Sequence, residues 1–297
     1  MDLIETENCL AWAATQIDLL PGTAPTPLPA TSSRVWKLET RSGPVILRAF
    51  IPSRWREEFP GLADREYQIL DALRKSSLPA PEPIAAVSDD QHGELILMSC
   101  VPGIVNLPIK PATSWLTGIA VMLAEIHAQT AVSVRGSYTS WNTSRGKSAP
   151  AWWKDVGVWS DAQAQIAHQP AFTASFIHRD FHPCNLLWRD GTLSGVVDWI
   201  NACMGPPSVD VAHCRLNLVA MYGEPEADVF LAAYLQRRPG FEHHPYWDLD
   251  AGLGAMPEPS VYPPWISFGL NHLREQDIGE RLIAFVTSRV TACASYR

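Results

Sequence analysis

One eight-residue segment in the second half of the chain, His178 to Asn185, restricts its fold more than any other. It has the sequence HRDFHPCN, and a second acid, Asp198, follows Asn185 by thirteen residues at the end of the apolar run GVVD. Apolar residues on either side, at 175–178 and 186–188, are typical of short strands. The sequence therefore predicts a loop between short strands that brings two carboxylates and an amide together.

These residue types suit phosphoryl transfer. A carboxylate such as Asp180 can accept the proton of an attacking hydroxyl. The amide oxygen of Asn185 and the carboxylate of Asp198 are hard ligands of the kind that Mg²⁺ prefers. The H-R-D-x-x-x-x-N form matches the catalytic loop of protein kinases. The alternative, that Asp180 and Asn185 only close a turn, is disfavoured by the accompanying His178, Arg179 and strand-end Asp198.

Three segments together resemble the aminoglycoside phosphotransferase superfamily: HRDFHPCN, the run GVVDWI from Gly195, and the run GPPSVDVA from Gly205. The resemblance extends from about Arg34 to Trp247 and is sharpest between His178 and Ala212. It implies a protein-kinase-like fold and an ATP-dependent transfer of phosphate to a hydroxyl of a small molecule, either aminoglycoside-like, an amino alcohol or a sugar. It also implies that Asp198 binds Mg²⁺ and that Asp210 holds the catalytic loop by accepting hydrogen bonds.

The order of predicted elements indicates an α+β chain. Residues 34–40 and 45–50 predict a hairpin, 54–75 a helix and 94–98 a further strand. The later helices are predicted at 115–129, 209–221, 226–236 and 277–294. A mainly β part thus precedes a mainly helical part. With the resemblance, we expect a bilobal fold with a nucleotide-binding lobe at 1–101 and a catalytic and substrate-binding lobe at 102–297.

The N-terminal part contains candidates for the remaining nucleotide contacts of this fold. Arg48, on the second strand of the hairpin, is placed to contact the phosphates, and Glu66, on the following helix, to orient it. Arg keeps its charge and can bind phosphate with two donors. An ordinary surface Arg and Glu is the competing interpretation. The sequence has no G-x-G-x-x-G, so residues 30–34, which are rich in hydroxyls, are the candidate phosphate loop.

The strand at 94–98 and the turn after it resemble the segment that joins the two lobes in this fold. Adenine would bond to backbone groups near Ser99, Cys100 and Val101, and Met98 would line the purine pocket. A simple edge strand is the alternative interpretation.

Other features carry weaker signals. We interpret His182 as a structural loop residue. Adjacent His243 and His244 do not form a zinc pattern. Trp152, Trp153 and Trp159 lie where this family elaborates its substrate lobe, and residues 246–250 resemble a segment near the acceptor site of relatives. Residues 238–265 otherwise give no assignable pattern.

Composition excludes some functions. The net charge of −8 is unlike that of a nucleic-acid-binding surface. No apolar run reaches the roughly 18 residues of a membrane span. The N-terminus is acidic where a signal peptide would be basic. Six scattered cysteines are typical of reduced thiols. We therefore expect a cytoplasmic protein whose partner is a small molecule, and the sequence does not indicate an oligomeric state.

Two alternatives to a small-molecule kinase can be weighed. A protein kinase is disfavoured because only a dozen residues separate Asp198 from Asp210, which leaves no room for an activation loop. A catalytically inactive, kinase-like nucleotide-binding module is favoured by the missing glycines and by Arg48 in place of Lys. The intact Asp180, Asn185 and Asp198 favour an enzyme.

Overall fold

A computed structural model describes residues 3–51, 60–256 and 259–296 of the chain. It separates into two compact units. The first comprises Met1–Ile104 with Leu187–Asp190 and Ser194–Asn201, and the second comprises Val105–Leu186, Gly191–Leu193 and Ala202–Arg297. The first unit thus includes two short segments that lie far beyond residue 101, among them the segment that carries Asp198.

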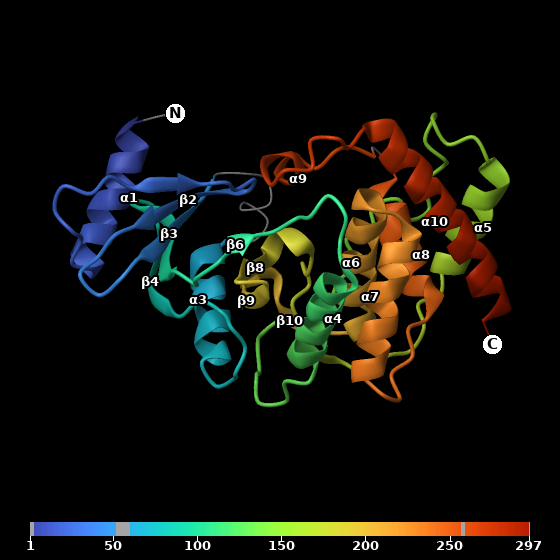
Figure 1. The fold of residues 1–297 in the computed structure, drawn as a ribbon, viewed down its shortest axis with the longest axis horizontal. Helices are drawn as coiled ribbons and strands as arrows, with labels where there is room; N and C mark the ends of the chain where they lie inside the picture. Colours follow the sequence, from blue (N-terminus) through green and yellow to red (C-terminus); the bar gives the residue numbers. More distant parts are fainter. Residues whose placement is uncertain (1–2, 52–59, 257–258, 297) are drawn as a thin grey trace. The chain divides into compact units, whose positions relative to one another are not determined.

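The first unit is built on a five-stranded antiparallel sheet in the order β1-β2-β3-β5-β4 (Figure 1). Its strands are β1 (Thr26–Leu28), β2 (Ser33–Leu38), β3 (Val45–Phe50), β4 (Pro83–Asp89) and β5 (Gly93–Ser99), and its helices are α1 (Leu3–Gln16) and α3 (Leu62–Leu73). A small sheet has the order β6-β8-β9, formed by β6 (Ile104–Val105), β8 (Leu186–Arg189) and β9 (Thr192–Val196), and the 3-10 helix η2 (Trp199–Asn201) follows it.

The alternation of side chains along the strands determines what each face of the five-stranded sheet contacts. Leu47 and Ala49 of β3 join a buried cluster with Trp12 and Ala13 of α1. Arg48, between them in sequence, points to the other face, where it reaches Glu66 of α3. Successive side chains of a strand point to opposite faces. The mostly apolar strand β3 can therefore still direct one buried cation, Arg48, toward α3.

Most of the predicted elements of this unit are confirmed, and others were not foreseen. The hairpin at 34–40 and 45–50 corresponds to β2 and β3, and the strand at 94–98 to β5. The predicted helix at 54–75 is confirmed only over α3, which begins at Leu62 after the left-handed Gly61 and ends at Leu73. Residues 54–59 lie outside the described ranges. Helix α1 and strands β1 and β4 were not predicted.

The second unit is mainly helical (Figure 1). Its helices are α4 (Thr113–His127), α5 (Val156–Ile166), α6 (Pro207–Met221), α7 (Glu224–Arg237), α8 (Pro245–Ala255), α9 (Pro263–Ser267) and α10 (Glu275–Ser295). Strands β7 (Ser175–Ile177) and β10 (Cys203–Gly205) pair antiparallel, and the 3-10 helix η1 (Pro183–Asn185) lies between β7 and β8. Most of α6 is buried, and it packs against α7, α8 and α10.

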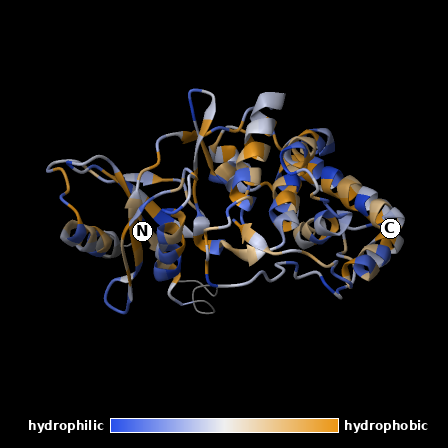
Figure 2. Ribbon diagram, turned by 90° about the horizontal axis from the view of Figure 1, so that it is seen from below, coloured by the Kyte–Doolittle hydropathy of each residue, from blue (hydrophilic) through white to orange (hydrophobic). Residues whose placement is uncertain are grey.

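The helices predicted at 115–129, 209–221, 226–236 and 277–294 are confirmed as α4, α6, α7 and α10. The unassigned stretch 238–265 contains α8 and the start of α9. The α+β class is confirmed. In Figure 2 the helices carry both hydrophobic and hydrophilic residues, and none in the described ranges is long and apolar enough to cross a membrane.

Candidate functional site

In the first unit, Arg48 forms the centre of a buried charge cluster. Its Nη1 lies 3.0 and 3.1 Å from the two carboxylate oxygens of Glu66 and 2.8 Å from Oδ1 of Asp198. Its Nε donates to Ser33 Oγ at 3.1 Å. Arg48 is 6% exposed and Glu66 1% exposed. The structure thus brings together the predicted cation, its predicted carboxylate partner and the predicted metal ligand Asp198, and it excludes the interpretation of Arg48 and Glu66 as ordinary surface residues.

The cluster contains two carboxylates for one guanidinium. Burial raises the pKa of Glu66 to about 7, although Arg48 opposes that rise. Asp198 and Glu66 hold the pKa of Arg48 above its usual range against the effect of burial. All hydrogen bonds from Arg48 to described residues use Nε and Nη1, so the Nη2 group is not used within the cluster. The cluster therefore has both an unused donor group for an anion and an excess carboxylate charge for a cation.

Asp198 has an unusual backbone conformation. It follows β9 and precedes η2 with φ of 64°, a left-handed conformation that costs a non-glycine residue free energy. Its side chain is 29% exposed. Only Oδ1 bonds to Arg48, so Oδ2 can serve as an oxygen ligand. The strained backbone and the half-paired carboxylate fit the metal-binding role predicted for Asp198.

The predicted adenine-binding segment lies at the end of β5 in the same unit. Met98 is buried, Ser99 N–H donates to the Glu82 carbonyl at 2.8 Å, and Cys100 N–H donates to the Pro44 carbonyl at 3.3 Å. These bonds fix the backbone and occupy two of the three N–H groups that were candidates for nucleotide contacts. The Val101 N–H, which donates no backbone hydrogen bond to described residues outside the strands, is left as a candidate. Val101 is followed by Pro102 and by Gly103, whose φ of 137° suits glycine.

The candidate phosphate loop at 30–34 connects β1 to β2. Thr31 and Ser32 are exposed at its tip, whereas Ser33 is buried. The hydroxyl of Ser33 binds Arg48 and so positions the guanidinium. This function of one loop hydroxyl was not anticipated from the sequence.

In the second unit, Asp210 holds the catalytic loop, as predicted. Its two carboxylate oxygens each accept a 2.7 Å hydrogen bond, from the backbone N–H groups of His178 and Arg179. His127 Nε2 lies 3.1 Å from Oδ2, and His127 Nδ1 lies 2.6 Å from the hydroxyl of Tyr234. Although burial acts to raise it, these bonds keep the pKa of Asp210 below its usual range. The loop before Asp180 is therefore fixed by a buried carboxylate on α6.

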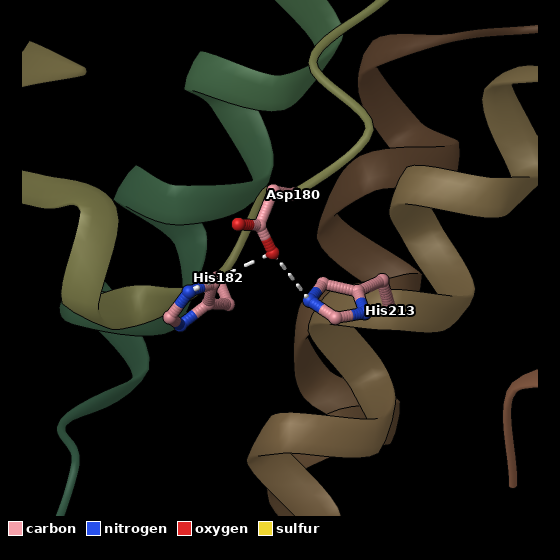
Figure 3. A group of neighbouring side chains, drawn as sticks. All are labelled: Asp180, His182 and His213. Carbon is pink, nitrogen blue, oxygen red and sulfur yellow. Dashed lines mark ion pairs between the residues drawn. The ribbon is translucent and has the colours of Figure 1, made fainter. Parts of the chain in front are cut away.

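Asp180 lies between two imidazoles (Figure 3). Its Oδ1 is 3.1 Å from Nε2 of His213 and 3.9 Å from Nε2 of His182. Its backbone N–H donates to His178 Nδ1 at 3.3 Å. Burial acts to raise the pKa of Asp180, but the hydrogen bond from His213 and the charges of the surrounding imidazoles hold it below its usual range. The carboxylate is therefore ionised near neutral pH, as a proton acceptor requires.

Sequence reasoning missed His213, which comes from α6, and assigned His182 a purely structural role. A signal for His213 was present. It follows Asp210 by three residues on one helix, and such residues share a face. Because Asp210 was expected to face the predicted catalytic loop, this spacing could have indicated that His213 faces it as well, but the prediction was not made.

Asn185 is fixed at the end of η1. Its Nδ2 donates to the backbone carbonyl of Asp180 at 2.9 Å. This bond uses the amide nitrogen, so the amide oxygen remains available as a metal ligand. Asn185 is thus held to the Asp180 loop in an orientation that suits a hard-metal ligand.

Beside this loop the second unit contains a cavity of about 200 Å³. Aromatic residues Tyr138, Trp141 and Trp247 line it together with Arg179, His213 and Asp250. The guanidinium of Arg179 lies over the ring of Trp141, 3.7 Å from its centroid. Arg179 also has a left-handed backbone, with φ of 73°. The cavity therefore adjoins the candidate base through His213, and one strained residue forms part of its wall.

The remaining signals from the sequence have different outcomes. Trp153 and Trp159 are buried and stack edge to face, so they belong to the core, whereas Trp141 and Trp247 line the cavity. Asp250, from the segment that resembled an acceptor-site region, also lines it. His243 binds Asp248 at 2.8 Å, and His244 accepts the backbone N–H of Tyr246. Those two histidines thus have separate partners.

Comparisons with known proteins identify the family of this chain. The sequence profile of the Phosphotransferase enzyme family matches residues 25–247. A homoserine kinase from Beijerinckia indica subsp. indica is 37% identical over 78 residues, which are 26% of this chain and 23% of that protein. The local match therefore spans about a quarter of each chain.

Solved structures share the fold at low identity. Amicoumacin kinase hAmiN, in complex with AMP-PNP, Ca²⁺ and Ami, aligns with a TM-score of 0.65 and 15% identity over 100% of this chain and 96% of that chain. A microcompartment-associated aminopropanol kinase aligns with a TM-score of 0.63 and 14% identity over 98% and 97%. The profile match over most of the chain, together with this fold, shows that the chain belongs to the phosphotransferase enzyme family.

Proposed function

We propose that this protein transfers the γ-phosphoryl group of ATP, with Mg²⁺, to a hydroxyl group of a small molecule. The observation that carries the proposal is the position of the Asp180 carboxylate. It lies on a loop fixed by Asp210 and is linked through His213 to an aromatic-lined cavity. A fixed carboxylate beside a cavity suits the orientation and deprotonation of an acceptor hydroxyl.

The nucleotide would bind through groups of the first unit. The unused Nη2 of Arg48 would contact the phosphates, with Glu66 holding the guanidinium in position. Adenine would pack on Met98 and bond to backbone groups of the Ser99–Val101 segment. A family structure with bound AMP-PNP supports a nucleotide in this fold.

Mg²⁺ would be held by Asn185 and Asp198. Each side chain presents an oxygen that its own hydrogen bonds leave available, and the excess carboxylate charge around Arg48 fits a bound cation. The ion would neutralise charge on the transferred phosphate. The protein's own groups would supply alignment and proton acceptance rather than a covalent intermediate.

The cavity favours a compact acceptor with few positive charges. Asp250 is the carboxylate in its wall, and its oxygens already bind Ser140, Asn142 and Arg145, the last at 2.7 Å. The guanidinium of Arg179 and the imidazole of His213 also line the wall. A polycationic aminoglycoside would therefore find no unpaired carboxylate among the lining residues, whereas a neutral sugar needs none and an amino alcohol brings a single positive charge.

An acceptor screen tests the function. ADP release with Mg-ATP is measured for homoserine, aminopropanol, simple sugars and an aminoglycoside, and products are identified by mass spectrometry. The proposal expects at least one phosphorylated product, whose formation requires Asp180. Tight Mg-ATP binding with no turnover on a broad panel would favour the inactive nucleotide-binding module instead.

A further inference from the structure

Asp180, His182 and His213 lie close together, and we call these three residues the Asp180 triad. One carboxylate oxygen and two imidazole nitrogens all lie within 4.8 Å of one another (Figure 3). The side chains are 24%, 7% and 22% exposed, respectively. The cluster is thus mostly enclosed, while two of its members remain open to an entering ion.

The donor set of the triad differs in kind from the predicted magnesium ligands. Two imidazoles and one carboxylate suit zinc and similar divalent transition metals, whereas Mg²⁺ prefers oxygen ligands alone. Catalytic zinc sites usually have three protein ligands and one open coordination position. Ligand atoms around a tetrahedral zinc lie about 3.4 Å apart, given bonds of about 2.1 Å. The separations of 3.1 and 3.9 Å in the triad bracket that value.

The two imidazoles are held in place by aromatic neighbours. His182 packs edge to face against His213, with ring centroids 5.7 Å apart, and against Tyr262 at 6.1 Å. His213 in turn packs against Trp141 at 6.3 Å. Both nitrogens nearest Asp180 are Nε2 atoms directed at the same carboxylate oxygen. An ion entering between them would require only small rotations of side chains.

We propose that the Asp180 triad is a binding site for a divalent transition metal of the zinc type, distinct in its ligands from the magnesium site. Because the ion shares the carboxylate that acts as base, its binding blocks phosphoryl transfer; this consequence rests on the proposed function, while binding itself does not. The metal takes the place of the hydrogen bond from His213 to Asp180. The triad would thereby make the enzyme sensitive to zinc in the presence of saturating Mg²⁺.

Cobalt binding tests the site without any acceptor. The chelator-treated, untagged chain is titrated with Co²⁺, and visible ligand-field absorption is followed. We expect one Co²⁺ per chain with a tetrahedral nitrogen and oxygen spectrum, which Zn²⁺ displaces and Mg²⁺ does not. Thiolate charge-transfer bands would instead place the metal on the cysteines and overturn the proposal, as would a lack of absorption.

Variants locate the metal. His182→Ala and His213→Ala should each weaken Co²⁺ binding by at least about 10- to 100-fold. Removing a group that only hydrogen-bonds to a metal ligand already costs that much affinity, and these variants remove a ligand itself. His92→Ala is the matched control, since His92 also contacts a carboxylate, that of Asp89 at 3.0 Å, but belongs to no such cluster in the described chain. His213→Gln repeats the test with a side chain of similar size. Unchanged binding in both His213 variants, with native circular dichroism, would overturn the assignment.

Inhibition by zinc separates this proposal from the proposed function. With a productive acceptor and fixed Mg-ATP, each variant is normalised to its own zinc-free rate. Zinc should inhibit the wild-type chain and the His92→Ala variant at concentrations at least about tenfold below those needed for His182→Gln. Co²⁺ binding by the triad without any phosphorylated product would leave the site standing and reject the function. Phosphoryl transfer without Co²⁺ binding would reject the metal site and leave the proposed function standing.

Discussion

The Nε2 atom of His213 lies 3.1 Å from Oδ1 of Asp180, which makes a residue of α6 the hydrogen-bond partner of the candidate base. His213→Ala should therefore raise the pKa of Asp180. Since the base acts when ionised, the acidic limb of the pH–rate profile should move to higher pH. The turnover number should fall roughly 10- to 100-fold, the kinetic equivalent of a hydrogen bond to a charged group. Steady-state rates across pH check this, and a profile that keeps its acidic limb would show that His213 does not act on Asp180.

Arg48→Met should weaken nucleotide binding and destabilise the first unit. The change leaves the buried carboxylate of Glu66 without its cation, and breaking a buried pair in this way costs about 3–5 kcal/mol. Arg48→Lys keeps the positive charge but loses the forked geometry of the guanidinium. Its free energy of unfolding should therefore stay closer to the wild-type value than its affinity for Mg-AMP-PNP does. Calorimetric titration with Mg-AMP-PNP and urea unfolding measure the two effects. Equal affinity in the wild-type, Lys and Met chains would remove Arg48 from the nucleotide site.

Arg179→Gly should weaken binding of the acceptor while changing the stability of the fold little. Glycine relieves the left-handed backbone at φ of 73°, a gain of roughly 1 kcal/mol. Against this stand the lost contact with Trp141 and the lost hydrogen bond to the Thr139 carbonyl, each worth roughly 0.5–1 kcal/mol. The melting temperature should hence change little, while the KM for the acceptor rises and that for ATP does not. Arg179→Ala, which keeps a Cβ in the strained conformation, should be about 1 kcal/mol less stable than Arg179→Gly. If both KM values are unchanged, Arg179 does not contribute to the acceptor wall.

Asp210→Ala should unfold the catalytic loop or the whole second unit. It removes the acceptor of two backbone N–H groups and of His127, and each buried unsatisfied donor costs about 1–3 kcal/mol. Because folding lowers the pKa of Asp210, its contribution is present above the unfolded-state pKa of about 3.9 and is lost as pH falls through the lower folded value. Urea unfolding at several pH values should show a difference between wild type and variant that shrinks in acid. A constant difference would contradict the linkage.

The sequence predicted elements with strong periodicity and residues within a compact motif. Strand β3 was foreseen residue for residue, and the hydrogen bonds to Asp210 were expected. Helix α1 was missed, and its buried residues Cys9, Trp12 and Ala13 join the core in a cluster with Trp36 and the neighbouring strands. Strand β4 was missed because Pro83 and two alanines hide its alternation.

The residues next to Asp180 in sequence do not indicate its partner His213, whose signal lies in its spacing from Asp210 on α6. His213 lies 33 residues beyond Asp180 and reaches it only because Asp210 fixes α6 against the loop. Likewise, Trp141 and Trp247 line the cavity, whereas the more closely spaced Trp153 and Trp159 pack into the core. Long-range packing, which composition does not encode, decides which aromatic side chains meet the acceptor.

Transfer of radiolabelled γ-phosphate to the best acceptor, compared between wild type and Asp180→Asn, tests the central claim most directly. The variant keeps the size of the side chain but removes the charge that accepts the proton. The turnover number should fall by roughly 10²- to 10⁴-fold, the usual contribution of a general base. Mg-AMP-PNP affinity should stay near the wild-type value, because Arg48 and the Ser99–Val101 segment are unaltered. Transfer at the wild-type rate by Asp180→Asn would contradict the account.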